Sequence, residues 1–132
     1  MSKRKLTILA GVSLFLLVYV TYGLWIAKDV RTILTIGMQP DSSYDNYMSE
    51  QAYHRLNPIR NGMTNSTYTY QSENHHIGPV FLFHFFVVAK TSTKQSFEFQ
   101  NKSVSFGGTE VVKMTTKLKH GRWYASEIHI AP

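Results

Sequence analysis

The pattern of apolar positions divides the chain into one continuous hydrophobic segment and a longer region of alternating character. Leu6–Ala27 contains no charged residue, while Lys3, Arg4 and Lys5 precede it and Lys28 follows it. A helix rises about 1.5 Å per residue, so this segment is long enough to cross a hydrocarbon core of about 30 Å. We therefore predict a membrane anchor in residues 1–27, in contact with lipid, and a single domain in 28–132.

The hydrophobic segment has two other possible interpretations, a cleaved signal peptide and a pilin-like stem. A cleaved signal peptide has a shorter apolar stretch followed by small residues. Thr21–Gly23 offers such a site, although Leu24–Ile26 continue the apolar run beyond it. A pilin-like stem needs an acidic residue soon after a leader glycine, and none follows Gly11. The anchor is favoured, and cleavage stays an alternative.

Basic residues around the segment predict its orientation. Lys3–Lys5 form an uncompensated basic tail, whereas Asp29 accompanies Lys28 and Arg31 at the other end. Basic residues concentrate on the cytoplasmic side of membrane spans. We expect a single-pass protein of the cell membrane, with its N-terminus in the cytoplasm and its domain outside.

Helical periodicity continues beyond the anchor. Val30, Ile33 and Leu34 keep a one-sided apolar face, which extends to Met38. Membrane segment and first domain helix are therefore predicted to form one stem. A second helix is expected up to Leu56, with its N-cap in 41–43 and with Tyr44 and Tyr47 on its apolar face.

From residue 66 the period changes from helical to alternating, which indicates strands. The apolar run Val80–Val88 has hydrophobic residues on both faces, a pattern typical of a strand in the middle of a sheet. The expected strands are 66–70, Val80–Val88, Ser96–Phe106, Thr109–Lys119 and Trp123–Ala131, with turns at Thr91–Gln95, Gly107–Gly108 and His120–Arg122.

The last strand changes parity along its length. Trp123 and Ala125 share one face, whereas Ile128 and Ile130 share the other. A β-bulge near Ser126 would bring both pairs to the core. The predicted fold class is α+β, with helices packed on a strongly curved antiparallel sheet of four to five strands.

Composition narrows the classes of function. The 132 residues carry a net charge of +6 and include no cysteine, which excludes disulfides and thiolate sites. Much of the charge excess lies in Lys3–Lys5, so the domain is only mildly basic and nucleic acid is not an expected partner. The sequence has no glycine-rich phosphate loop, and no cofactor is predicted.

The end of the chain resembles the nuclear-transport-factor-2-like superfamily. The resemblance rests on element order and on a lysine-alternating strand, the hairpin His120–Arg122, Trp123, and the finish at Ile128 and Ile130. It implies a cone-shaped domain with a pocket at its open end. The whole architecture is similar to membrane-anchored subunits of type IV secretion and conjugation systems, which implies a protein partner in an envelope assembly.

His84 is the main candidate for chemistry because it lies between Phe83 and Phe85 in an apolar strand. Superfamily enzymes of the isomerase and dehydratase type place a base in the pocket, so the resemblance implies a general base here. A core histidine bonded to a neighbouring carbonyl is the favoured alternative. Phe83 and His84 are accordingly predicted to contact a ligand or partner, rather than to catalyse.

Aromatic and basic residues suggest two further surfaces. Tyr44, Tyr47, Tyr68 and Tyr70 could line a pocket mouth, although ordinary half-buried packing is the stronger interpretation. A basic stripe would face anionic headgroups or acidic wall polymers, or would be a solvated face. The stripe consists of Lys113, Lys117, Lys119 and Arg122.

Histidines do not predict a metal site. His75 and His76 are adjacent in a loop and lack a spaced third ligand, and Glu127 with His129 supplies only two. We therefore expect a membrane-tethered, non-catalytic binding domain outside the cytoplasm, in a cell-envelope, secretion or conjugation assembly. The alternative is a small pocket enzyme that uses His84. A homodimer through Val80–Val88 is permitted but not required.

Overall fold

A computed structural model describes residues 2–40, 43–65, 67–102 and 104–131 of the chain. Its longest element is the helix α1, Lys3–Met38, followed by the short helix α2, Glu50–Leu56, and the 3-10 turn η1, Ser72–Asn74. Four strands complete the fold: β1 (His75–His84), β2 (Val88–Asn101), β3 (Val104–Lys119) and β4 (Arg122–Ala131). They form one antiparallel sheet in the order β1-β2-β3-β4. The coarse α+β prediction is confirmed.

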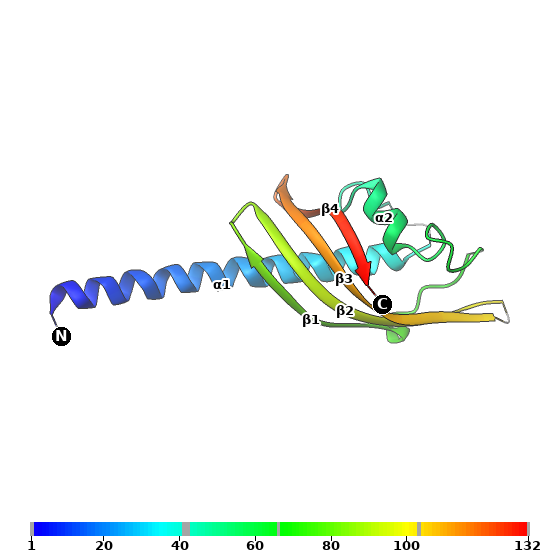
Figure 1. The fold of residues 1–132 in the computed structure, drawn as a ribbon, viewed down its shortest axis with the longest axis horizontal. Coiled ribbons are helices and arrows are strands. Elements are labelled where there is room, and N and C mark those ends of the chain that lie inside the picture. The colour runs from blue at the N-terminus through cyan, green and yellow to red at the C-terminus, as the bar shows by residue number, and fades with distance from the viewer. Residues whose placement is uncertain (1, 41–42, 66, 103, 132) are drawn as a thin grey trace.

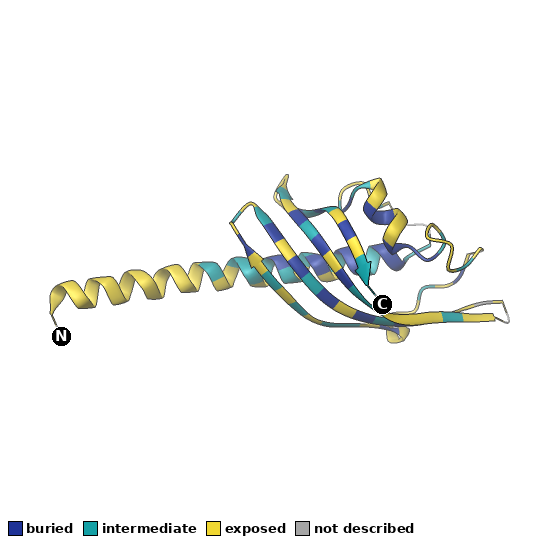
Figure 2. Cartoon of the chain, viewed as in Figure 1, coloured by how far each residue is buried: buried dark blue, intermediate teal, exposed yellow. Residues whose placement is uncertain are grey.

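The helix α1 belongs to two environments. Its first half projects away from the sheet and is exposed, whereas its second half lies across the sheet and is buried (Figures 1 and 2). Partial burial begins at Tyr19, and Ile26 is the first fully buried residue. The helix is long and apolar enough to span a membrane. Its unbroken course to Met38 confirms the predicted continuous stem.

Helical spacing explains which side of α1 is buried. Residues three and four apart lie on one face of a helix. In the second half of α1, the residues of one face pack against the sheet and α2. The buried residues of this face are Ile26, Val30, Ile33, Leu34, Gly37 and Met38. At Gly37 the helices approach so closely that a Cβ would lie 2.0 Å from Leu56 Cδ2.

The second helix is shorter than predicted. It begins at Glu50, with Ser49 Oγ accepting from Ala52 N at 3.1 Å, so Tyr44 and Tyr47 lie outside it. The preceding segment instead bonds the free edge of β4, where Ala125 N donates to Tyr47 O at 2.9 Å. Pairing with a sheet edge replaced helix formation here. The predicted N-cap at Asp41 and Ser42 lies outside the described residues.

The strand predicted over 66–70 is wrong for the residues that the structure describes. Residues 67–71 belong to no strand, and Ser66 is not among the described residues. Side-chain contacts hold this segment in place of a ladder. Tyr68 stacks on Phe99 with ring centroids 5.1 Å apart, and its hydroxyl donates to Met38 O.

Two predicted turns are also wrong. Thr91–Gln95 is the middle of β2, where Thr91, Thr93 and Gln95 face inward and are buried. Gly107–Gly108 lies inside β3, and the chain reverses instead beyond Asn101, where Lys102 has a φ of 59°. Polar and glycine-rich composition suggested turns. Pairing with both β1 and β3 keeps Thr91–Gln95 extended, and pairing with β2 keeps Gly107–Gly108 extended.

β1 is an edge strand that ends at His84, which corrects the prediction of one strand over Val80–Val88 in the middle of the sheet: residues 85–87 form the turn to β2. Leu82 faces α1, where its Cδ1 would lie 3.6 Å from a Cβ on Gly23. The opposite face is uncovered: Phe81 and Phe83 are 71% and 56% exposed. An apolar face does not by itself reveal whether protein covers it.

The end of the chain agrees with its predictions. His120 and Gly121 both have positive φ, 53° and 75°, as a two-residue type I′ hairpin requires. A register shift opposite Thr115 and Thr116 leaves Ser126 unpaired, which is the predicted β-bulge. Trp123, Ala125 and Ile128 are consequently all buried.

Candidate functional site

His84 ends β1 and fastens the sheet to α1. Its Nδ1 accepts from Phe86 N at 3.1 Å, so its Nε2 carries the proton and donates to Tyr19 O at 2.9 Å. The imidazole stacks on the Tyr19 ring, with centroids 3.9 Å apart, and is 2% exposed. Both ring nitrogens are therefore engaged by backbone atoms, an arrangement that favours a structural histidine over a general base.

Phe86 completes an aromatic junction between the β1–β2 turn and α1. Val87 N donates to Phe85 O at 2.7 Å, which makes a γ-turn around Phe86, whose φ is 63°. Such a turn is rare and strained for a bulky residue. The Phe86 ring packs edge-on against Tyr22 and Tyr19, with centroids 5.2 and 6.1 Å apart. Contact with α1 thus holds the turn in a conformation that it would not adopt alone.

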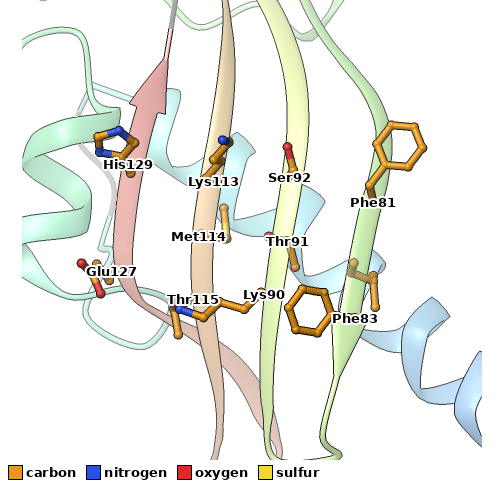
Figure 3. Close-up of a pocket in the computed structure, with 11 residues that line it drawn as sticks. Phe81, Phe83, Lys90, Thr91, Ser92, Lys113, Met114, Thr115, Glu127 and His129 are labelled. Carbon is orange, nitrogen blue, oxygen red and sulfur yellow. Dashed lines mark hydrogen bonds between the residues drawn. The ribbon is translucent and has the colours of Figure 1, made fainter.

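A groove of about 580 Å³ crosses the outer face of the sheet, opposite α1 (Figure 3). Two cross-strand rows line it, and strand pairing defines their members: Phe81, Ser92, Lys113 and His129 in one row, and Phe83, Lys90, Thr115 and Glu127 in the other. The phenyl rings lie at the β1 end and the charged groups over β2 to β4 (Figure 3). Lys90 Nζ donates to Thr115 Oγ1 at 2.9 Å. The groove is thus apolar on one side and cationic in its middle.

The predicted basic stripe is divided between two places. Lys113 lines the groove, and Lys117 is exposed on the same outward parity of β3. Lys119 and Arg122 flank the β3–β4 turn, where Lys119 lies over the Tyr124 ring at 4.6 Å and Arg122 over the Tyr47 ring at 4.4 Å.

The four predicted tyrosines do not come together in one pocket. Tyr44 stacks on Tyr53 with centroids 4.1 Å apart, and Tyr47 lies beneath Arg122. Tyr68 is buried against the end of α1, and burial raises the pKa of its hydroxyl well above the ordinary value. These contacts fit the packing interpretation better than a pocket mouth.

A buried polar network was missed at the sequence level. Tyr70 Oη lies 2.8 Å from His75 Nδ1, His75 Nε2 lies 2.8 Å from Gln95 Oε1, and Gln95 Nε2 donates to Glu110 Oε1 at 2.7 Å. Burial lowers the pKa of His75 and raises that of Glu110. Gln95 shares the parity of Ala89 and Phe97, and that alternation was the signal for an inward-facing position.

The structure offers no cluster of three metal-ligating side chains among the residues it describes. His75 has partners on both ring nitrogens, and His76 points away from it to the exposed face. Glu127 and His129 lie in different rows of the groove.

Comparison with known proteins adds no relative: no protein-family model, curated protein or solved structure matches this chain.

Proposed function

We propose that this protein is a membrane-tethered binding domain that holds a groove at a fixed position beside the bilayer. The observation that carries the proposal is the continuity of α1. One helix supplies both an exposed apolar half and the buried face against which the sheet packs. A helix without a break transmits position and orientation, so the domain and its anchor would act as one rigid body.

The groove would bind a polypeptide that carries acidic and aromatic or aliphatic side chains. Lys90 and Lys113 supply positive charge in its centre, and Glu127 is the acidic group that lines it. Phe81 and Phe83 supply uncovered aromatic surface at one side. Exposed aromatic residues beside charged groups are common anchors of protein interfaces.

Assignment to an envelope, secretion or conjugation assembly, and the nuclear-transport-factor-2-like relationship, belong to the same proposal. An antiparallel sheet packed on a long helix supports the α+β class, on which the relationship depends. A domain outside the cytoplasm is proposed from the basic tail at Lys3–Lys5. The enzymatic alternative is not favoured, because His84 uses both ring nitrogens to join the turn to α1.

Site-specific photo-crosslinking tests the binding role. A photoreactive residue in place of Thr115, in the full chain in its native membranes, should yield one discrete crosslinked protein. Lys113→Glu should reduce that product severalfold by reversing a charge in the groove. Lys102→Glu, a charge reversal at the far β2–β3 turn, should leave it unchanged. Absence of the product, or equal yields from both variants, would contradict the proposal.

A further inference from the structure

We propose that the β1–β2 turn is a second membrane-contacting element, in which Phe85 and Val87 enter the outer part of the same bilayer leaflet that α1 leaves. The inference rests on the proposed anchoring of α1. The bilayer would then cover part of the sheet as well as α1, so that the domain is partly immersed in the membrane rather than held above its surface.

Helix length places the turn below the membrane surface. Tyr19 follows Lys5 by fourteen positions, which advance the helix about 21 Å at about 1.5 Å per residue. A hydrocarbon core of about 30 Å that begins at Lys5 therefore ends near Trp25, about 9 Å beyond Tyr19. Tyr19 Oη accepts from His84 N at 3.1 Å, so the end of β1 lies at the depth of Tyr19. Tilt of the helix would carry it deeper.

The surface of the turn suits hydrocarbon. Between His76 and Lys90 the chain has no Asp, Glu, Lys or Arg. Phe85 is 74% exposed and Val87 59% exposed. Between them, the Phe86 ring connects the turn to the uncovered apolar half of α1, since its centroid lies 6.3 Å from that of Phe15. The apolar surface of the span therefore continues onto the sheet.

Backbone hydrogen bonding in the turn is also of the kind that lipid demands. Hydrocarbon offers no partner to a peptide group, so each must be satisfied within the protein. His84 N donates to Tyr19 Oη and Phe86 N to His84 Nδ1. Phe85 N donates to Val88 O and Val87 N to Phe85 O, at 2.9 and 2.7 Å. All four consecutive N–H groups of the turn are thus bonded internally.

Charged residues border the apolar surface at the level where headgroups would lie. The β1–β2 turn reaches further toward the start of α1 than the β3–β4 turn does (Figure 1). Trp123 N, at the start of β4, donates to Asp29 Oδ2 at 3.0 Å, four residues beyond Trp25. Lys119 and Arg122 flank that turn, where cations can meet lipid phosphates. Lys117 is paired with Val88, and its long side chain can extend to the same level.

Single-cysteine labelling can test the depth of the turn, because the chain has no native cysteine. The full chain would be reconstituted in vesicles of phosphatidylcholine and phosphatidylglycerol, with an environment-sensitive fluorophore on Val87→Cys. Val104→Cys is the matched control, since Val104 is 65% exposed at the opposite turn of β2. Val12→Cys, on the exposed half of α1, reports the anchor itself.

The label at position 87 should emit at shorter wavelength than that at 104, and nitroxide groups on lipid chains should quench it severalfold more than aqueous iodide does. A label at 87 that iodide quenches as it does at 104 would overturn the inference while leaving the anchor intact. Shielding from both quenchers would overturn it too, because protein would then cover the turn. Exposure of the label at position 12 to iodide would refute the anchoring proposal as well.

Discussion

The two ends of β2 carry turns of similar exposure and opposite character. At one end the exposed Phe85 and Val87 flank Phe86, whose ring packs on α1, in a stretch without charged residues. At the other, Val104 is exposed among polar neighbours such as Gln100 and Ser105, and the joined ends of β2 and β3 project away from the rest of the sheet (Figure 1). The fraction exposed does not distinguish them. Their surroundings do, and they show that exposed apolar surface must be interpreted with its neighbours.

Each turn is also held by different forces. Aromatic packing on α1 and the hydrogen bonds of His84 fix the β1–β2 turn. The strands that enter the β2–β3 turn are fixed by close backbone approach, because a Cβ on Gly107 would lie 2.2 Å from Phe97 O. Substitutions at the two ends of β2 should therefore destabilise the fold for different reasons.

The largest effect is expected from Gly107→Ala at the β2–β3 end. Its Cβ would overlap backbone atoms of Phe97 and Glu98, which cannot move without breaking the pairing of β2 with β3. We expect the free energy of unfolding to fall by about 3 kcal/mol, the upper end of the usual cost of overpacking. Urea unfolding of the full chain, followed by fluorescence of the buried Trp123, measures it. Gly108→Ala is the control, since nothing lies within 4 Å of its Cβ; equal losses would refute the packing argument.

His84→Phe should have the next largest effect, at the β1–β2 end. Phe86 N would lose its acceptor in a partly buried place, and an unsatisfied polar group there costs about 1–3 kcal/mol. The chain should still fold, because the ring can keep its contact with Tyr19. The same unfolding experiment checks this, with His129→Phe on the exposed outer face as the comparison. An unchanged stability would mean that His84 does not secure the turn.

A charged residue introduced at each turn should change the stability of the chain in lipid vesicles by different amounts. Val87→Asp should destabilise the folded chain in vesicles by about 1 kcal/mol, as a charge does between the middle and the surface of a bilayer. Val104→Asp should have little effect, since water already surrounds that turn. Thermal unfolding in vesicles measures both, and equal shifts in Tm would remove the distinction between the ends of β2.

The smallest expected effect is a dependence of stability on pH, which arises in the buried network near the middle of the sheet. Burial lowers the pKa of His75, so the unfolded chain binds a proton more readily than the folded chain. Stability should therefore fall as pH drops below about 6.5, the ordinary value for histidine. Urea unfolding between neutral and mildly acidic pH measures this fall, which His75→Gln should abolish.

Glu110 has the opposite sign and provides the control. Burial raises its pKa, so its contribution to stability is present below the ordinary glutamate value and is lost as pH rises through the raised one. Glu110→Gln should therefore increase the free energy of unfolding more at neutral than at acidic pH. The loss of stability that comes from protonation of His75 should remain. Two results together would contradict the assignment to His75. The stability of the wild-type chain would not change between neutral and mildly acidic pH, and the stability of the Glu110→Gln chain would not fall over the same range.

Periodicity predicted the parts of the fold that a single apolar face determines. The spacing of Val30, Ile33 and Leu34 extended α1 into the domain, and the parity change between Ala125 and Ile128 located the β-bulge. In both cases protein covers the apolar side. The pattern along the chain then contains the information that is needed.

Sequence reasoning failed where the partner of a face is distant or where the structure leaves the face uncovered. Both faces of the predicted strand Val80–Val88 are apolar, which suggested a central position, yet β1 lies at an edge and Phe81 and Phe83 are exposed. Gln95 looked like part of a turn because its partners, His75 and Glu110, come from two other strands. At the site, the sequence suggested that His84 is a bonded core histidine, but it did not indicate the partner. The reason is that the contact of its ring with Tyr19 joins residues 65 positions apart.

Both the fixed position of the groove and the depth of the β1–β2 turn depend on the rigidity of α1. Distances between spin labels on Val12→Cys and Val104→Cys, in the same full chain in lipid vesicles, test it directly by pulsed electron paramagnetic resonance. One label lies on the exposed half of the helix and the other at the far turn of the sheet. A rigid α1 should give one narrow distance distribution. A broad distribution, as a flexible break near Lys28–Arg31 would produce, would contradict it.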